Sequence, residues 1–319
     1  MTEQVTTGPV NAGADDHERV TEHRGKSNTG LYVGHRPVWY MEAIKVVVLV
    51  ICCLAVIGPF VMVVATSFAD PVQIGRSGGL VLWPENPTLE AYQVIFAGGQ
   101  VTQALGVSGF VTIVGTMLSL LLTSLLAYAL SRTQMLFSKF LLMGVLLTML
   151  FSAGMIPLYL TVKSFNLLDS VWSLIIPTSV SAFNVIVMRQ FFQNLPAELT
   201  EAASIDGASE LRIYWSIILP LSKPIMAAIG LFYAVAYWNT FFSALLYIND
   251  TEKWPIQLVL RQYLVNNQQV SVEMAGEIPP PQPALQMAIL VIALIPIACV
   301  YPFLQKHFTK GVLTGAVKG

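Results

Sequence analysis

Charged residues are scarce in this chain of 319 residues, and several long segments contain none. Asp, Glu, Lys and Arg make up 11% of the sequence, hydrophobic residues 55%, and the net charge is −1. Because a soluble domain carries roughly 25% charged residues, this composition excludes an ordinary soluble protein. A net charge so close to zero also excludes the strongly basic surface that nucleic-acid binding requires, so no nucleic-acid partner is expected.

The residues that would hold a metal or a nucleotide are also sparse. The three cysteines, Cys52, Cys53 and Cys299, lie in apolar runs at a spacing that fits neither a disulfide framework nor a metal site. The tripeptide that starts at Gly25 resembles the end of a phosphate-binding loop, but Val20 stands where the first glycine is needed. We therefore expect no metal, no cofactor and no ATP site, so any ATP chemistry has to come from a partner.

Long hydrophobic runs are what the sequence has in abundance. Each of six runs has 18 or more residues without Asp, Glu, Lys or Arg, and about 20 helical residues cross a hydrocarbon core of roughly 30 Å. Since backbone groups inside a membrane must be satisfied internally, each run predicts one transmembrane helix. The runs are Val46–Thr66, Gly106–Leu130, Phe140–Val162, Val171–Met188, Pro224–Tyr247 and Ala284–Gln305.

The fold class expected from these runs is an all-α integral membrane protein. Residues 42–319 form its domain of six transmembrane helices. Residues 1–41 are polar and predict a disordered tail. The distribution of Lys and Arg predicts that both termini are cytoplasmic, because 13 of the 17 then lie on the inner side. The four outer cations are Arg76, Lys163, Lys253 and Arg261.

The segment 193–223, between the fourth and fifth runs, predicts two short helices joined by a turn. Pro196 suits the first turn of a helix, Gly207 can take the left-handed conformation that ends one, and Ser222 can cap the next span. Two apolar faces are predicted, although the same pattern also fits an interfacial amphipathic element with no partner. They are formed by Leu199, Ala202 and Ala203, and by Leu211, Tyr214, Trp215 and Ile218.

The segment contains Glu201-Ala202-Ala203, then Gly207, then Ile217-x-Leu219-Pro220. These residues and their spacing resemble the EAA signature of the permease subunits of ATP-binding-cassette (ABC) importers. The resemblance implies the type I, MetI-like permease fold, in which a short coupling helix docks into a groove of the ATPase subunit. The coupling residues would be Glu201, Ala202, Ala203, Asp206, Gly207, Ile217, Leu219 and Pro220. Glu210, which lies between the signature residues Gly207 and Ile217, is expected to be exposed and uninvolved.

Further likeness, over roughly residues 40–319, points to carbohydrate-type permeases and to the branch that imports oligosaccharides and polysaccharide fragments. It rests on the motifs 155–159 and 237–242 and on the C-terminal segment. The resemblance implies an ATPase homodimer, a second permease in a heterodimer, an extracytoplasmic solute-binding protein and membrane lipid as partners. The chain would be a multi-pass protein of the bacterial cytoplasmic membrane, and hydrolysis would belong to the ATPase.

Four residues are candidates for a sugar path. Polar groups in the middle of a membrane helix either line a path or bond a neighbouring helix, and the fifth run places Asn239 and Thr240 there. Aromatic rings suit sugar faces as well as helix packing, so both interpretations stay open. The candidates are Tyr159, Tyr237, Asn239 and Thr240.

Other functions fit the sequence less well. A secondary transporter usually places ionisable residues inside the membrane, and the six runs contain none. A permease for a solute other than a sugar remains the closest alternative. A structural membrane protein would not need the EAA pattern, and an intramembrane enzyme would need a catalytic cluster that the runs do not contain.

Overall fold

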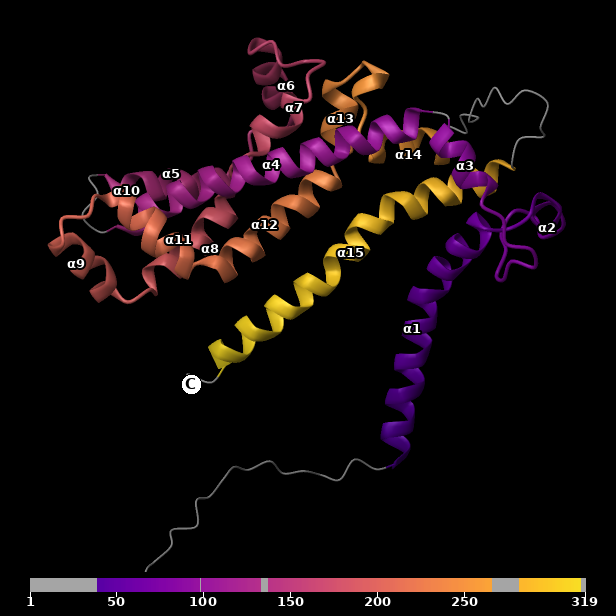
Figure 1. Ribbon diagram of the computed structural model, residues 1–319, viewed down its shortest axis with the longest axis horizontal. Helices are drawn as coiled ribbons and strands as arrows, with labels where there is room; N and C mark the ends of the chain where they lie inside the picture. The colour runs from indigo at the N-terminus through magenta and orange to yellow at the C-terminus, as the bar shows by residue number, and fades with distance from the viewer. Residues whose placement is uncertain (1–38, 98, 133–136, 266–280, 317–319) are drawn as a thin grey trace, which may run out of the picture. The chain divides into compact units, whose positions relative to one another are not determined.

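The computed structural model describes residues 39–97, 99–132, 137–265 and 281–316, so the predicted tail lies outside it up to residue 38. The chain divides into two units after Cys53, inside the first helix, and the features below concern the second unit. All regular secondary structure in the described residues is helical, as the sequence predicts. The longest helices are α1 (Trp39–Ser67), α4 (Gln100–Ser131) and α15 (Gln282–Ala316) (Figure 1).

The remaining helices are short. In the described residues, three helices are long and apolar enough to cross a membrane alone, and three bent pairs bring the number to as many as six. The short helices outside the predicted spans are α2 (Pro71–Arg76), α3 (Glu90–Ala97), α9 (Ala197–Ile205), α10 (Glu210–Ile213), the π-helix η2 (Tyr214–Ile218), α11 (Leu219–Leu221), η3 (Thr251–Lys253) and α14 (Ile256–Leu264).

Three of the six runs are broken, so the prediction of one continuous helix per run is wrong for them. In the third run, α5 (Ser138–Leu150) and α6 (Met155–Ser164) meet at 117°. Gly154 lies at the break with φ of +81°, a conformation that a residue with a Cβ atom rarely takes. The direction of the chain therefore changes inside the apolar run.

The fourth run breaks around a proline. The short helices α7 (Trp172–Ile175) and η1 (Ile176–Thr178) precede α8 (Ala182–Gln193), and the bend is 51°. Pro177 has no backbone N–H and its ring cannot fit an uninterrupted α-helix. The break leaves backbone groups that need partners from other helices.

The fifth run breaks at polar residues. Helix α12 (Lys223–Trp238) ends before Asn239, and α13 (Phe242–Tyr247) begins three residues later. The Asn239 amide donates to Val235 O (2.8 Å) and Thr240 Oγ1 to Ala236 O (3.3 Å). Side chains that bond the preceding turn compete with the helical backbone, so these two residues lie at a helix end rather than in the middle of a helix.

Tyrosines of α12 hold the break near Pro177. Tyr237 donates its hydroxyl proton to Ile175 O (3.2 Å), and the Tyr233 hydroxyl accepts from Ser181 N–H (2.9 Å). The same hydroxyls bond α4, at Ser119 (2.8 Å) and Thr123 (2.6 Å). Because a backbone group in hydrocarbon has no water to bond, these contacts join α4, α8 and α12 at the point where α8 begins.

The packing of α4 against α12 depends on one glycine. A Cβ atom on Gly115 would lie 2.8 Å from two ring carbons of Tyr237. Tyr237 is 3% exposed, so its ring fills the space that Gly115 leaves. A second apolar cluster lies around α3, α14 and α15, and Trp238 Nε1 joins it by donating to Ala293 O (3.0 Å).

The carboxylate of Asp169 links the loop before α7 to the loop after α13. The backbone of Asp169, at φ +56°, donates to Tyr247 O (2.8 Å). Its carboxylate accepts from the backbone N–H groups of Asn249 and Asp250 and from the Asn249 amide. These hydrogen bonds hold the pKa of the Asp169 carboxyl group below its ordinary value, and the bond from the Asn249 backbone contributes most.

This pKa predicts an acid-sensitive contact. A carboxyl group whose pKa is lower in the folded chain stabilises it fully above the unfolded pKa of about 3.9, and that stability is lost as the pH falls through the folded pKa. Asp169→Asn, which tolerates the left-handed backbone, should therefore lower the unfolding temperature at neutral pH and have less effect near pH 3. Thermal unfolding of the detergent-solubilised chain measures this, with Glu85→Gln as the control. An equal deficit at every pH would contradict it.

Candidate functional site

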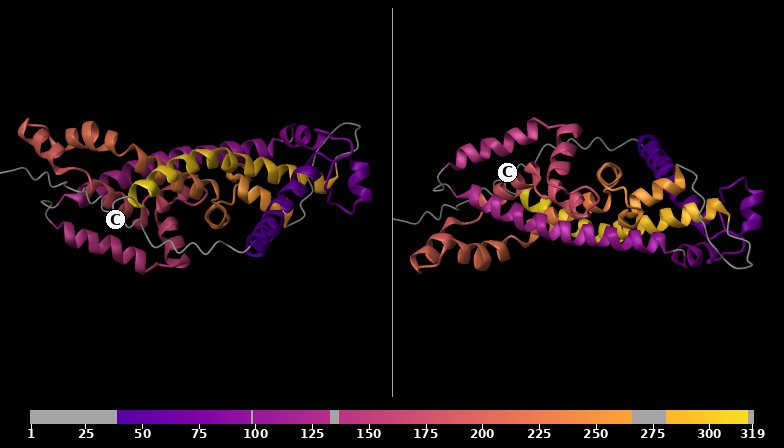
Figure 2. Two further views of the ribbon diagram at one scale, coloured as in Figure 1. Left: turned by 90° about the horizontal axis from the view of Figure 1, so that it is seen from below. Right: turned by 90° about the horizontal axis from the view of Figure 1, so that it is seen from above.

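The loop between α8 and α12 contains the EAA signature and gathers at the end of α4 where Ser131 lies (Figure 1). In both views of Figure 2 its helices project from that end. Pro196 precedes α9 rather than lying in its first turn, and Ser209 Oγ caps α10 by accepting from Arg212 N–H (3.4 Å). The loop is therefore two helical pieces joined by a turn, as predicted.

Gly207 ends the first helical piece in the predicted left-handed conformation. Its φ is +76°, and the next residue closes the turn with a hydrogen bond from Ala208 N–H to Ala203 O (2.9 Å). A Cβ atom on Gly207 would meet nothing within 4 Å. Glycine is therefore favoured here by the backbone conformation alone and not by crowding.

The predicted small-residue face of α9 is divided in the structure. Thr200 is buried. Ala203 is half-buried against the main hydrophobic cluster, which includes buried side chains of α4, α8, η2 and α12. On the other side, Ala202 is exposed together with Leu199 and Ile205, which is 86% exposed. The two alanines of the signature thus do different things: Ala203 holds α9 to the chain, and Ala202 is free to contact a partner.

The second predicted face is wrong in register. Ile213, Tyr214 and Ile218 are buried, whereas Leu211 and Trp215 are 66% and 55% exposed. The physical reason is the contact with α4: the segment packs against it by the side that carries Ile213, Tyr214 and Ile218, and Leu211 and Trp215, four residues apart, fall outside that contact.

The signature residues at the end of the π-helix and just after it pack less tightly. Ile217 and Leu219 are half-buried against the main cluster, and Pro220 is exposed. The predicted cap by Ser222 is also wrong. Its φ and ψ of −95° and 11° do not suit a cap, and its hydroxyl is buried without a hydrogen-bond partner among the described residues.

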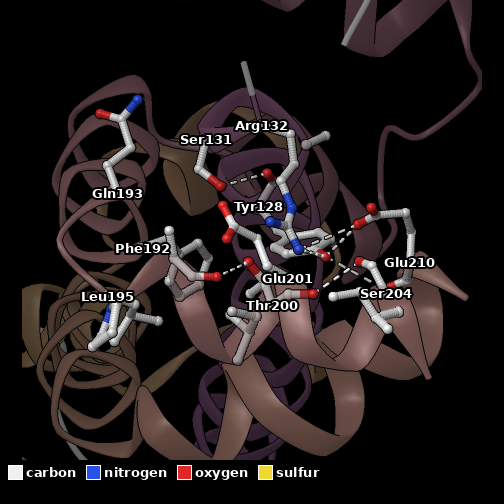
Figure 3. Close-up of a pocket in the computed structure, with 15 residues that line it drawn as sticks. Tyr128, Ser131, Arg132, Phe192, Gln193, Leu195, Thr200, Glu201, Ser204 and Glu210 are labelled. Atoms are coloured by element: carbon white, nitrogen blue, oxygen red, sulfur yellow. Dashed lines mark hydrogen bonds and ion pairs between the residues drawn. The ribbon is translucent and has the colours of Figure 1, made fainter. Parts of the chain in front are cut away.

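A cavity of about 1040 Å³ lies between α9 and the end of α4 (Figure 3). Glu201, the acid of the signature, lines it together with Arg132 and Tyr128. Asp206 lies outside it and is exposed at the end of α9. The cavity therefore has one wall from the signature and one from the membrane-crossing helix.

An ion pair that the sequence did not reveal crosses from α4 to the loop. Arg132 Nη2 lies 3.4 Å from Glu210 Oε2 and donates to the Tyr128 hydroxyl (2.6 Å), which donates in turn to Glu210 Oε2 (2.6 Å). The expectation that Glu210 is uninvolved is wrong, although its side chain is 67% exposed. The sequence feature that could have pointed to this ion pair is Arg132, because it is the first charged residue after the run Gly106–Leu130 and lies four residues after Tyr128.

Breaking this contact should weaken the loop modestly. Because the carboxylate is largely exposed, Glu210→Ala is expected to lower the free energy of unfolding by about 1 kcal/mol. Arg132→Gln should have a similar effect, and the two changes together should cost less than their sum. Urea unfolding of the purified chain and its double-mutant cycle measure this, with Glu198→Ala as the control. Strict additivity would show that the ion pair contributes nothing.

The four candidate path residues differ in exposure, and Tyr159 packs against the hydrophobic cluster that contains Tyr237. Tyr159 is half-buried and stacks on Tyr247 with ring centroids 6.2 Å apart, while Tyr237 is buried with its hydroxyl bonded twice within the chain. Asn239 is exposed and Thr240 half-buried at the end of α12. Among the described residues, no group of three His, Cys, Asp or Glu side chains could hold a metal ion.

Comparison with known proteins decides what this arrangement is. The profile of the family described as binding-protein-dependent transport system inner membrane component matches residues 107–314. The chain belongs to this family. It is therefore a transmembrane permease component of an ABC importer with the MetI-like fold, and the predicted fold class and family are confirmed.

Two relatives of the permease come from Bacillus subtilis (strain 168). The polygalacturonan/rhamnogalacturonan transport system permease protein YtcP is 49% identical over 264 residues, which are 82% of this chain and 92% of the relative. Protein LplC is 47% identical over 264 residues, 82% of this chain and 89% of the relative. A crystal structure of a bacterial ABC transporter involved in the import of the acidic polysaccharide alginate superposes with a TM-score of 0.78. It is 29% identical and covers 86% of this permease and 98% of that chain.

Proposed function

We propose that this permease imports carbohydrate, in the form of oligosaccharides or polysaccharide fragments, as one half of a heterodimeric translocation path. A separate ATPase homodimer hydrolyses ATP, and an extracytoplasmic solute-binding protein delivers the sugar. The observation that carries the proposal is the 49% identity, over 82% of the chain, to a permease named for polygalacturonan and rhamnogalacturonan transport. The similarity to a transporter involved in alginate import supports the same substrate class.

The structure of the loop supports its role in coupling. A docking helix needs exposed apolar and small side chains on one side and a firm attachment on the other, and α9 has both. Ala202 would enter the groove of the ATPase, Glu201 and Asp206 would meet polar groups of the partner, and Gly207 would fix the angle of α9. Ile217, Leu219 and Pro220 would join the docked loop to α12, so that closure of the ATPase moves the spans as rigid bodies.

The topology that we propose places both termini and the loop 193–223 in the cytoplasm of a bacterial cell, within its cytoplasmic membrane. The excess of Lys and Arg on that side supports it. A single cysteine at Ser209, in a background without the three native cysteines, should resist an impermeant reagent in intact cells and react after lysis. Labelling in intact cells would contradict this topology.

Reconstitution tests the transport function directly. The permease with its partner permease, ATPase and binding protein should accumulate labelled oligogalacturonides in vesicles when ATP is present, and the permease alone should show no ATP turnover. Hydrolysis by the isolated chain would refute the division of labour. Uptake of a non-sugar solute in place of any oligosaccharide would favour the alternative permease function.

Asn239 is the candidate best placed to contact sugar, because its side chain is exposed at the end of α12. Its amide nitrogen is bonded to Val235 O, which leaves the amide oxygen available as an acceptor. Asn239→Ala is expected to reduce uptake several-fold through loss of a substrate contact, with little change in the amount of assembled complex. Uptake assays and co-purification measure the two effects, and normal uptake would assign Asn239 to structure alone.

A further inference from the structure

The loop has a second outward face, distinct from α9, on the segment 210–223. Leu211, Trp215 and Leu221 are 66%, 55% and 46% exposed there. Arg212 and Lys223 are also exposed on this segment and form no ion pair with a described residue. An exposed apolar surface with basic residues beside it is a feature of helices that lie in a membrane interface.

The direction of the segment relative to α12 supports the same location. Helix α12 has 16 residues, and residues 239–247 extend the same apolar run, so the run crosses the bilayer without the help of residues 210–221. The helices of Glu210–Leu221 and Lys223–Trp238 meet at 83°. A helix almost perpendicular to one that crosses the membrane lies along the membrane surface.

The packed side of the segment fixes which side is left for lipid. Tyr214 bonds Ser124 of α4 through its hydroxyl (2.7 Å), and its ring lies 5.2 Å from that of Tyr128. Ile213 and Ile218 are buried in the same cluster. The segment is thus held against the end of α4 by one side, and Leu211 and Trp215 point away from that contact.

We propose that the segment 210–223 is a lipid-binding face that takes anionic phospholipid. The side chains of Leu211, Trp215 and Leu221 enter the acyl-chain boundary, where the indole of tryptophan is favoured. The charged ends of Arg212 and Lys223 bind the phosphate groups, with their aliphatic stems along the apolar surface. This inference depends on the membrane location of the family and is independent of the substrate proposed above.

Charge separates this face from the surface proposed for the ATPase. Helix α9 and its cap carry Glu198, Glu201 and Asp206 without a basic residue. In the segment 210–223 the exposed acid Glu210 is paired with Arg132, which leaves Arg212 and Lys223 as the exposed charges that form no ion pair with a described residue. The ATPase therefore meets an acidic surface and the membrane a basic one. Lipid bound to residues 210–223 would hold the base of the loop, so that movement of α9 is passed to α12.

Quenching of tryptophan fluorescence by brominated lipid tests the apolar contact. The complete importer is placed in nanodiscs whose phosphatidylcholine carries bromine near the headgroup, and wild type is compared with Trp215→Phe. Removal of Trp215 should remove a large part of the lipid quenching, whereas the control Trp254→Phe, whose indole is bonded inside the chain to Ile248 O, should change it little. An unquenched Trp215 overturns the proposal. In nanodiscs that hold the two permeases without the ATPase, acrylamide that reaches Trp215 and is excluded once the ATPase is added would identify the ATPase as the occupant.

Uptake at different lipid charge tests the ionic contact. Wild-type uptake should rise several-fold between pure phosphatidylcholine and about 30 mol% phosphatidylglycerol, because each cation near an anionic surface adds to binding. Arg212→Gln with Lys223→Gln should flatten that rise and leave ATPase co-purification unchanged. The matched control is Arg76→Gln with Lys163→Gln, two exposed cations elsewhere. A rise retained in the first pair, or absent in wild type, refutes the lipid contact.

Discussion

Replacing Ala202 with aspartate is expected to lower ATP-driven uptake about tenfold or more, because a charge placed in an apolar contact costs well over 1 kcal/mol. Ala202 is exposed on α9, so the isolated permease should keep its unfolding temperature. Co-purification with the ATPase should fall in parallel with uptake. Asn86→Asp, which adds a charge to an exposed loop, is the control.

The same substitution at Ala203 should fail in a different way. Ala203 is half-buried against the main hydrophobic cluster, and its carbonyl accepts the hydrogen bond that closes the Gly207 turn. Ala203→Asp should therefore destabilise the loop itself, lowering the unfolding temperature as well as uptake. Full uptake and normal co-purification in Ala202→Asp would refute the docking role of this face.

Gly115→Leu is expected to have the largest effect on stability. The new Cβ atom would lie 2.8 Å from the Tyr237 ring, and the ring cannot swing aside without losing its bonds to Ser119 and Ile175. Overpacking costs about 1–3 kcal/mol, and each lost hydrogen bond adds about 1 kcal/mol. Most of the protein should therefore fail to reach a folded, extractable state, as size-exclusion chromatography after detergent extraction would show.

Two further variants separate this contact from a general effect of leucine in α4. Gly106→Leu changes the same helix at a site where a Cβ atom meets nothing within 4 Å, and it should fold. Combining Gly115→Leu with Tyr237→Ala removes the ring that the leucine would strike, and part of the folded yield should return. A stable Gly115→Leu protein would show that α4 and α12 do not pack as closely as described.

The sequence predicted features that depend on composition or on a single residue. Apolar runs identified the membrane segments, and Gly207 identified the left-handed turn, because each follows from local chemistry. The breaks at residues 151–154 and 239–241 could not be read in the same way. Hydropathy averaged over a whole run does not register a break of a few residues such as Asn239 and Thr240, and the bonds that stabilise each helix end are visible only in three dimensions.

Contacts between distant parts of the chain were also missed. Glu210 and Tyr128 are 82 residues apart, and either residue alone is typical of a solvated helix end. Leu211 and Trp215 were misassigned because apolar residues lie on more than one side of this segment, and only its contact with α4 decides which side is buried. The turn at Gly207 was therefore predicted, and the contacts that tie the loop to α4 were not.

The absence of charged residues from the six apolar runs has an electrical consequence. A charge that crosses the membrane field gains or loses about 2.3 kcal/mol per 100 mV. Since the runs contain no Asp, Glu, Lys or Arg, their rearrangement moves no side-chain charge of these residues through that field. Any dependence of uptake on membrane voltage is then expected to follow the charge of the transported solute, and an uncharged solute should cross at a rate that voltage does not change.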